Sequence, residues 1–83
     1  MGAPMSNTPH ELSEEFPAQV AKIQALKAGD AHFAKLAEEY HSVNRAVHRA
    51  ETRIDLITEE QEEALRRQRA HLKDHIWHHL KGV

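Results

Sequence analysis

The sequence predicts an all-α protein: an antiparallel helical hairpin with a short additional helix on its N-terminal side. Three observations support this prediction. Apolar residues recur at spacings of three and four along residues 31–54, a second helical pattern with a capping signal covers residues 59–80, and only residues 55–58 separate the two. Helices joined by so short a connection lie antiparallel.

The first arm of the hairpin, residues 31–54, has the longest unbroken apolar pattern in the chain. We expect its buried seam to consist of Phe33, Leu36, Tyr40, Val43, Val47, Ala50 and Ile54. The same register extended backward would bury Gly29 and Lys22, so a break is predicted at residues 29–30. Gly29 is then expected to close the preceding helix with a positive φ angle, and Asp30 to cap the next helix.

The second arm, residues 59–80, begins at Thr58-Glu59-Glu60-Gln61, which has the form of a capping box. Its apolar stripe is predicted to consist of Leu65, Leu72, Ile76 and Leu80. A turn near residue 56 places Glu38 opposite Lys73. Opposite charges facing each other across the hairpin favour this register.

The region before the hairpin is punctuated by prolines. Pro17 suits the first position of a helix over residues 17–28. Thr8-Pro9-His10-Glu11 has the form of a further capping box, so one helical turn is expected from Pro9 to near Phe16. We interpret residues 1–8 as a tag remnant and disordered tail, and residues 9–83 as a single helical domain.

The composition excludes several kinds of site. The chain has 83 residues and no cysteine, which excludes disulfides and thiolate zinc centres. Eleven Lys and Arg against thirteen Asp and Glu leave a net charge of −2, and this balance does not attract phosphate backbones or anionic membranes. No apolar run is long enough for a membrane span or a signal peptide, so we expect a soluble, cytoplasmic protein with no membrane partner.

The chain is unusually rich in histidine, with eight histidines in 83 residues. His71, His75 and His79 follow one another at intervals of four, so they share a face of the last helix. Imidazoles at this spacing are candidate ligands for zinc, copper or nickel. Histidines on a polar helix face are more often ordinary surface residues. We therefore predict no cofactor and retain a transition-metal site as an alternative hypothesis.

A run of arginines, Arg66-Arg67-Gln68-Arg69, is a candidate phosphate-binding patch. Glu62 and Glu63 precede it by four residues, which is the spacing of intrahelical ion pairs. A solvated helix face with paired charges is the commoner meaning of such a run. A nucleic-acid-associated protein is therefore a second alternative, and nucleic acid is the less favoured partner.

No constellation of catalytic residues is recognisable, because the sequence has neither a glycine-rich phosphate loop nor a nucleophile elbow. We predict that the protein is not an enzyme. The candidate interaction residues are apolar instead: Trp77, Leu80, Val20, Ile23 and Leu26. Helix 17–28 either folds over its own hairpin or packs on a neighbouring chain. The small core favours the second option, and with it a homo-oligomer.

Two stretches, Asp30-Ala31-His32-Phe33 and Gln68-Arg69-Ala70-His71-Leu72-Lys73-Asp74, resemble the signature segments of the YdcH family. These are small bacterial proteins grouped as a domain of unknown function. The resemblance covers about residues 10–80 and implies a bacterial, cytoplasmic helical hairpin without an established activity. The residues themselves predict a non-enzymatic interaction or adaptor protein that binds an unidentified protein partner through helix–helix packing.

Overall fold

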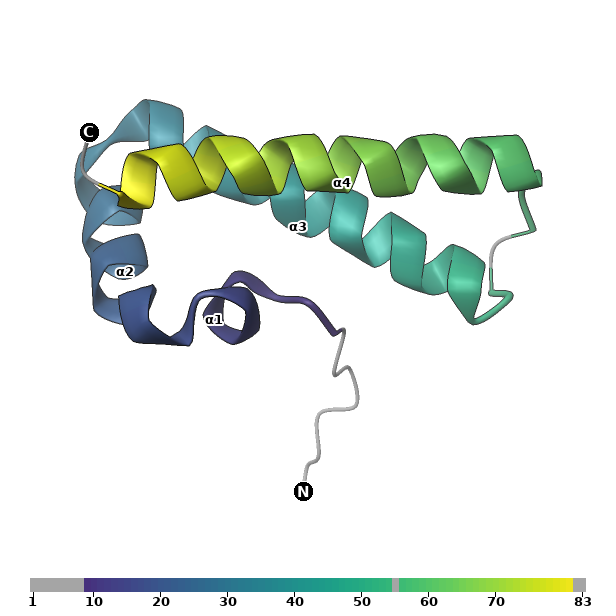
Figure 1. Cartoon of the computed structure of the whole chain (residues 1–83), viewed down its shortest axis with the longest axis horizontal. Helices are drawn as coiled ribbons and strands as arrows, with labels where there is room; N and C mark the ends of the chain where they lie inside the picture. The colour runs from purple at the N-terminus through teal and green to yellow at the C-terminus, as the bar shows by residue number, and fades with distance from the viewer. Residues whose placement is uncertain (1–8, 55, 82–83) are drawn as a thin grey trace, which may run out of the picture.

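The computed structural model describes residues 9–54 and 56–81, in which the only regular secondary structure is helical. In chain order they are α1 (Leu12–Glu15), the 3₁₀ turn η1 (Pro17–Gln19), α2 (Val20–Gly29), α3 (Ala31–Glu51) and α4 (Glu59–Leu80). Figure 1 shows α3 and α4 as an antiparallel hairpin, with α2 turned across its open end. The predicted all-α hairpin is confirmed. The predicted tag remnant and tail, residues 1–8, lie outside the described residues.

Both arms of the hairpin begin with the predicted caps. The Asp30 carboxylate accepts hydrogen bonds from the backbone N–H groups of His32 and Phe33, at 3.0 and 3.2 Å. Thr58 and Gln61 form the reciprocal capping box, with both hydrogen bonds at 3.0 Å. These bonds satisfy donors that the first turn of a helix leaves without a partner. The extended backbone of Asp30 (φ −135°, ψ 104°) also produces the predicted break between α2 and α3.

The predicted role of Gly29 is wrong. Gly29 is the last α-helical residue of α2 and does not adopt the left-handed conformation, and a Cβ built on it meets nothing within 4 Å. The break comes from Asp30 alone, whose backbone N–H still bonds the carbonyl of Leu26 at 2.8 Å. An aspartate that caps the next helix is sufficient to end the previous one.

The first arm ends at Glu51, three residues before the predicted end at 54. Arg53 takes the left-handed conformation (φ 65°). The N–H groups of Arg53 and Ile54 return to the carbonyls of Ala50 and Arg49, at 3.2 and 2.9 Å. This is the Schellman pattern of a helix C-terminus, formed here by an arginine in the place where glycine is usual. Ile54 is 68% exposed as a result and does not belong to the seam.

The core lies at the open end of the hairpin, where α1 and α2 meet α3 and α4. Its buried members are Leu12, Ile23, Phe33, Leu36, Ala37, Tyr40, Ile76 and Leu80, with Phe16, Leu26 and Leu72 packed at its edge. Helix α2 therefore packs on its own hairpin, and the sequence-based preference for packing on a neighbouring chain is wrong. Lys22 adds a hydrogen bond from its Nζ to the carbonyl of Leu80, at 2.8 Å.

The middle of the hairpin departs from the predicted seam at one position. Asn44 is fully buried and Val43 is only half-buried. On α4, Ile76 and Leu80 are buried as predicted, whereas Leu65 and Leu72 are half-buried. Val47 and Ala50 are buried in the predicted register, so the departure at Asn44 is local. Its amide is buried because it donates to the carbonyl of Pro9 and accepts from Arg69.

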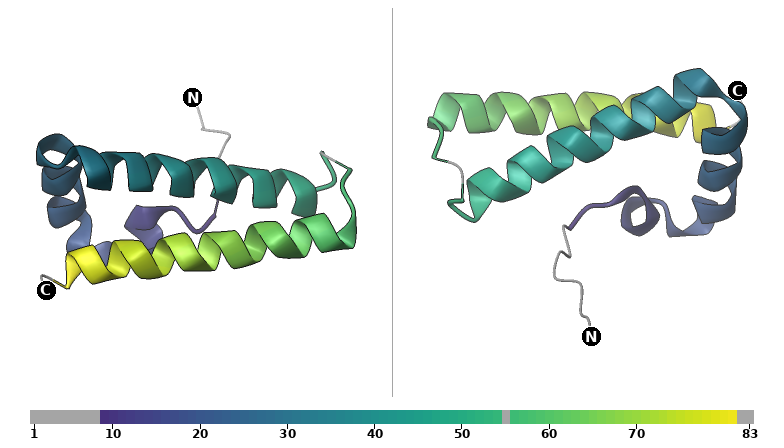
Figure 2. Two further views of the ribbon diagram at one scale, coloured as in Figure 1. Left: turned by 90° about the horizontal axis from the view of Figure 1, so that it is seen from above. Right: turned by 180° about the vertical axis from the view of Figure 1, so that it is seen from behind.

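The N-terminal turn also differs from the prediction. It begins at Leu12 instead of Pro9, because His10 has a positive φ of 63° that no helix accommodates. Glu11 stands at the N-cap without a side-chain capping bond. The turn does stop at Phe16, as Pro17 predicts. We call residues 9–16 the strap. Seen from above, the strap lies between α3 and α4 (Figure 2, left).

Candidate functional site

An aromatic pair stands on the surface where the strap meets α4. Trp77 is 39% exposed, and its ring is stacked on that of Phe16 with centroids 5.6 Å apart and an interplanar angle of 2°. Phe16 is held there because Pro17 ends α1 and turns the chain into η1. An open pocket adjoins the pair, lined by Glu15, Phe16, Pro17, Ala18, Gln19, Lys73, Asp74 and Trp77. We call the two rings and this pocket the aromatic platform.

A cluster of side-chain donors holds the strap from the hairpin side. The Tyr40 hydroxyl donates to the backbone carbonyl of His10 at 2.6 Å, and Asn44 Nδ2 donates to that of Pro9 at 2.8 Å. Arg69 Nη1 donates to Asn44 Oδ1 at 2.9 Å, which fixes the orientation of the amide. Burial raises the pKa of Tyr40 to about 12, so its hydroxyl remains a donor at every physiological pH.

Glu15 is the charged contact of the strap. Its carboxylate forms an ion pair with Lys73 of α4 and accepts from His10 Nδ1 at 3.0 Å. The hydrogen bond from Lys73, followed by that from His10, lowers the pKa of Glu15 below its ordinary value. Lys73 pairs with Glu15 in this way, and its predicted pairing with Glu38 is wrong.

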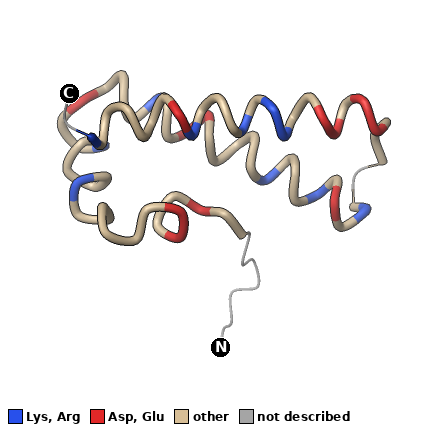
Figure 3. The backbone as a smooth tube through the Cα atoms, viewed as in Figure 1, with Lys and Arg blue, Asp and Glu red and all other residues tan. Residues whose placement is uncertain are grey.

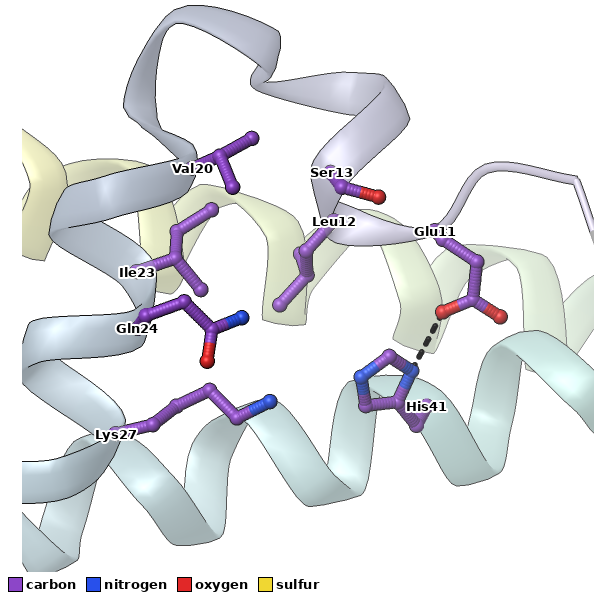
Figure 4. Close-up of a pocket in the computed structure, with 8 residues that line it drawn as sticks. All are labelled: Glu11, Leu12, Ser13, Val20, Ile23, Gln24, Lys27 and His41. Atoms are coloured by element: carbon purple, nitrogen blue, oxygen red, sulfur yellow. Dashed lines mark ion pairs between the residues drawn. The ribbon is translucent and has the colours of Figure 1, made fainter.

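A second pocket lies on the other side of the strap, between α1, α2 and α3 (Figure 4). Leu12 and Ile23 form its apolar floor. At one rim, Glu11 Oε1 lies 2.6 Å from His41 Nδ1, and Lys27 stands at the opposite rim. This contact ties the strap to α3, as Lys73 ties it to α4.

The five predicted interaction residues divide into two groups. Ile23 and Leu80 are 4% and 2% exposed in the core, and Leu26 packs at its edge. These three are used within the chain. Val20 and Trp77 are 38% and 39% exposed, and they are the two that remain accessible to a partner.

The structure does not assemble the predicted histidine site. The His79 ring packs edge-on against Phe33, with centroids 5.6 Å apart, and lies 5.8 Å from the ring of His32. His71 and His75 line a different pocket between α3 and α4. Within residues 9–54 and 56–81, no three His, Asp or Glu side chains are placed to share one metal ion. The predicted spacing of four is present, but the rings have separate surroundings.

The arginine run is largely paired with carboxylates. Arg66 contacts Glu51 at 3.1 Å and also Glu62, and Arg67 lies 3.8 Å from Glu63. Arg69 points to Asn44 instead of solvent. Figure 3 shows the acidic residues at the start of α4 followed directly by the basic run. The surface is one of mixed charge, as the spacing of the glutamates predicted.

Comparison with known proteins identifies the family. The family model described as "Protein of unknown function (DUF465)" matches residues 33–80, which is more than half of the chain. The chain belongs to this family. No curated protein and no solved structure matches the chain significantly. The DUF465 segment comprises nearly all of α3 and the whole of α4, and it leaves the strap and α2 outside.

Sequence reasoning missed the strap and its donors. Two of the strap's anchoring atoms are backbone carbonyls, which every residue possesses, so no residue type marks them. The signal that was available is the position of Asn44, four residues after Tyr40 on the same helix face. An amide within an apolar seam requires a partner when it is buried.

Proposed function

We propose that this DUF465 protein is a non-enzymatic interaction module that binds the apolar face of a partner helix on its aromatic platform. The observation that carries the proposal is the exposure of Trp77. The other large aromatic side chains of the hairpin, Phe33 and Tyr40, are 0% and 1% exposed, whereas Trp77 is 39% exposed although the core lies one residue away at Ile76.

The state of Trp77 suits it to be an anchor. Tryptophan is among the residues that contribute most to binding energy at protein interfaces, because it buries a large apolar area. The parallel stack on Phe16 already restricts the Trp77 ring, so Trp77 loses little side-chain entropy when a partner binds. Lys73 and Asp74 at the edge of the platform supply the polar rim that such interfaces have.

The alternatives receive less support from the same residues. The arginines that a nucleic acid would need are paired with Glu51, Glu62 and Glu63. A metal centre would need ligands that converge, and the described part of the chain offers no group of three. None of its helices is long and apolar enough to cross a membrane. We place the interaction in the cytoplasm, as the sequence leads us to expect.

The test compares Trp77→Ala with His78→Ala, an exposed neighbour on the same helix that serves as the matched control. A second copy of the chain is the first partner to test, by sedimentation of all three proteins at high micromolar concentration. Affinity capture from the source organism is the second. We expect a partner that binds the wild-type and His78→Ala proteins and is lost with Trp77→Ala, while circular dichroism shows that all three are folded. Equal binding by the three proteins would refute the platform.

A further inference from the structure

The strap is bound to the hairpin as a ligand is bound to a site. Glu11 has an extended backbone, His10 has a positive φ of 63°, and α1 adds a single helical turn. His41 of α3 contacts Glu11, and Trp77 of α4 stacks on Phe16. The remaining polar contacts of this segment with α3 and α4 depend on four side chains that we call the donor site: Tyr40, Asn44 and Lys73, which contact the strap, and Arg69, which orients Asn44. A pocket beside the strap, lined by His10, Glu15, Tyr40, Arg66, Arg69, Ala70 and Lys73, shows that the strap does not fill the space between the helices.

The donor site and the strap have complementary chemistry. Toward the strap the donor site presents hydrogen-bond donors: a hydroxyl, an amide N–H and an ammonium group, with Arg69 orienting the amide. The strap presents acceptors, namely the carbonyls of Pro9 and His10 and the carboxylate of Glu15. Two of these three contacts use backbone atoms. At these two contacts the donor site therefore recognises backbone carbonyls, whatever side chains the two residues carry.

Side-chain selectivity comes from two strap positions. Leu12 is 3% exposed and inserts into the core, and Glu15, three residues later, meets Lys73. An occupant must therefore offer an apolar side chain and, three residues further on, a carboxylate. The apolar residue contributes burial, and the carboxylate supplies charge complementarity to Lys73.

Few buried apolar contacts hold the strap in place. It contributes a single fully buried apolar side chain, Leu12, and its backbone is strained at His10, where φ is 63°. All four donors lie within residues 33–80, the segment that the DUF465 model matches, and the strap lies outside it. The site thus belongs to the family segment, while its occupant does not.

We propose that the donor site is a binding site for an acidic peptide segment of a partner protein, non-helical at its start and ending in one helical turn, and that residues 9–16 occupy it in cis as an autoinhibitory strap. A partner segment with the pattern apolar-x-x-Glu displaces the strap and takes over its contacts. The tethered strap competes at a millimolar effective concentration, so only a favoured segment displaces it. The inference does not rest on the aromatic platform, although Glu15, Phe16 and Lys73 belong to both.

The experiment uses the full chain and a labelled peptide of residues 9–15 as the probe. In the Glu15→Lys chain the strap is repelled by Lys73 and the donor site is freed. We expect this chain to bind the peptide at least tenfold more tightly than wild type does, by fluorescence anisotropy. The Lys73→Glu chain should show the opposite selectivity: it should bind the peptide that carries Glu15→Lys more tightly than the wild-type peptide. Such charge-swapped selectivity is not expected of a segment that has a structural role only.

The single tryptophan provides an independent readout. Displacement of the strap moves Phe16 away from Trp77, and the peptide ends before Phe16, so the Trp77 emission should shift to the red as the peptide binds. If the Glu15→Lys chain loses its helical signal, Glu15→Gln removes the charge without repulsion and takes its place in the same titration.

Three results would overturn the proposal. The first is no binding of either peptide by either variant up to about 1 mM, the range of the effective concentration of a tethered segment. The second is binding that does not depend on the charges at positions 15 and 73. The third is a wild-type dimer in sedimentation that dissociates on Glu15→Lys, because the occupant would then be the strap of a second copy and not a partner's segment.

Discussion

Replacing Asn44 by alanine tests the feature of the hairpin that an apolar pattern does not predict. The Asn44 side chain is 0% exposed and joins three segments, because it donates to Pro9 of the strap and accepts from Arg69 of α4. The substitution removes both hydrogen bonds, worth about 1 kcal/mol each. It also leaves the Arg69 donor without this partner, at a cost of roughly 1–3 kcal/mol.

We therefore expect Asn44→Ala to lower the free energy of unfolding by about 3–5 kcal/mol, the sum of these costs. For a domain of this size a loss of 3 kcal/mol corresponds to a decrease in Tm of about 12–24 °C. Chemical denaturation followed by circular dichroism measures the first quantity, and a thermal scan the second. The combined Asn44→Ala and Arg69→Met variant should show a coupling of about 0.5–3 kcal/mol, because the two side chains share one bond.

Val43→Ala is the matched control, since the apolar alternation along α3 would make Val43 the buried residue. It is only half-buried, so its truncation should cost about 1 kcal/mol. Ser42→Ala, at an exposed position, should change stability by less than about 0.5 kcal/mol. The reasoning is refuted if Asn44→Ala lowers the free energy of unfolding less than Val43→Ala does, because Val43 would then be the buried residue of the seam.

Further outcomes are expected at helix ends and at Tyr40. Gly29→Ala should raise the unfolding free energy by about 0.5–1 kcal/mol in urea titrations, because Gly29 is helical and a Cβ has space. A lower unfolding free energy would instead support the positive φ angle that the sequence predicts for Gly29. Arg53→Gly should stabilise by a similar amount by relieving the positive φ, about 0.5–1 kcal/mol, whereas Arg53→Ala should not. Tyr40 should titrate near pH 12 by ultraviolet absorbance. The protonated hydroxyl contributes to the unfolding free energy in full below about pH 10, and this contribution is lost as pH rises through 12. The Tyr40→Phe protein should lack this decrease in stability at high pH. A titration midpoint of Tyr40 near pH 10 would contradict its burial.

The parts of the fold that local chemistry determines were predictable. The caps at Asp30 and Thr58 were recognised because a short polar side chain before a helix has a strong preference for this role. The end of α3 was not, because Arg53 adopts a conformation that is typical of glycine and asparagine. The packing of α2 on its own hairpin was not predictable, because Val20, Ile23 and Leu26 suit an internal and an external surface, and the small size of the core favours the external one.

The candidate sites were less predictable, for a physical reason. Trp77 was singled out because its residue type is informative by itself. The intervals between His71, His75 and His79 place three rings on one helix face, but whether those rings converge depends on their neighbours, and His79 packs on Phe33 instead. Contacts to backbone carbonyls leave no trace in the identity of the residues that provide them.

The position of the core at the open end of the hairpin has a consequence for the synthesis of the protein. Ile76 and Leu80 complete a core whose other members begin at Leu12. At about 5–20 residues per second, the ribosome needs about 1–5 s to proceed from Ile54 to Leu80. During that interval the apolar faces of α2 and α3 have no α4 to cover them. The core therefore cannot be completed until the final turn of α4 has been made, and until then the apolar faces of α2 and α3 are open to chaperones.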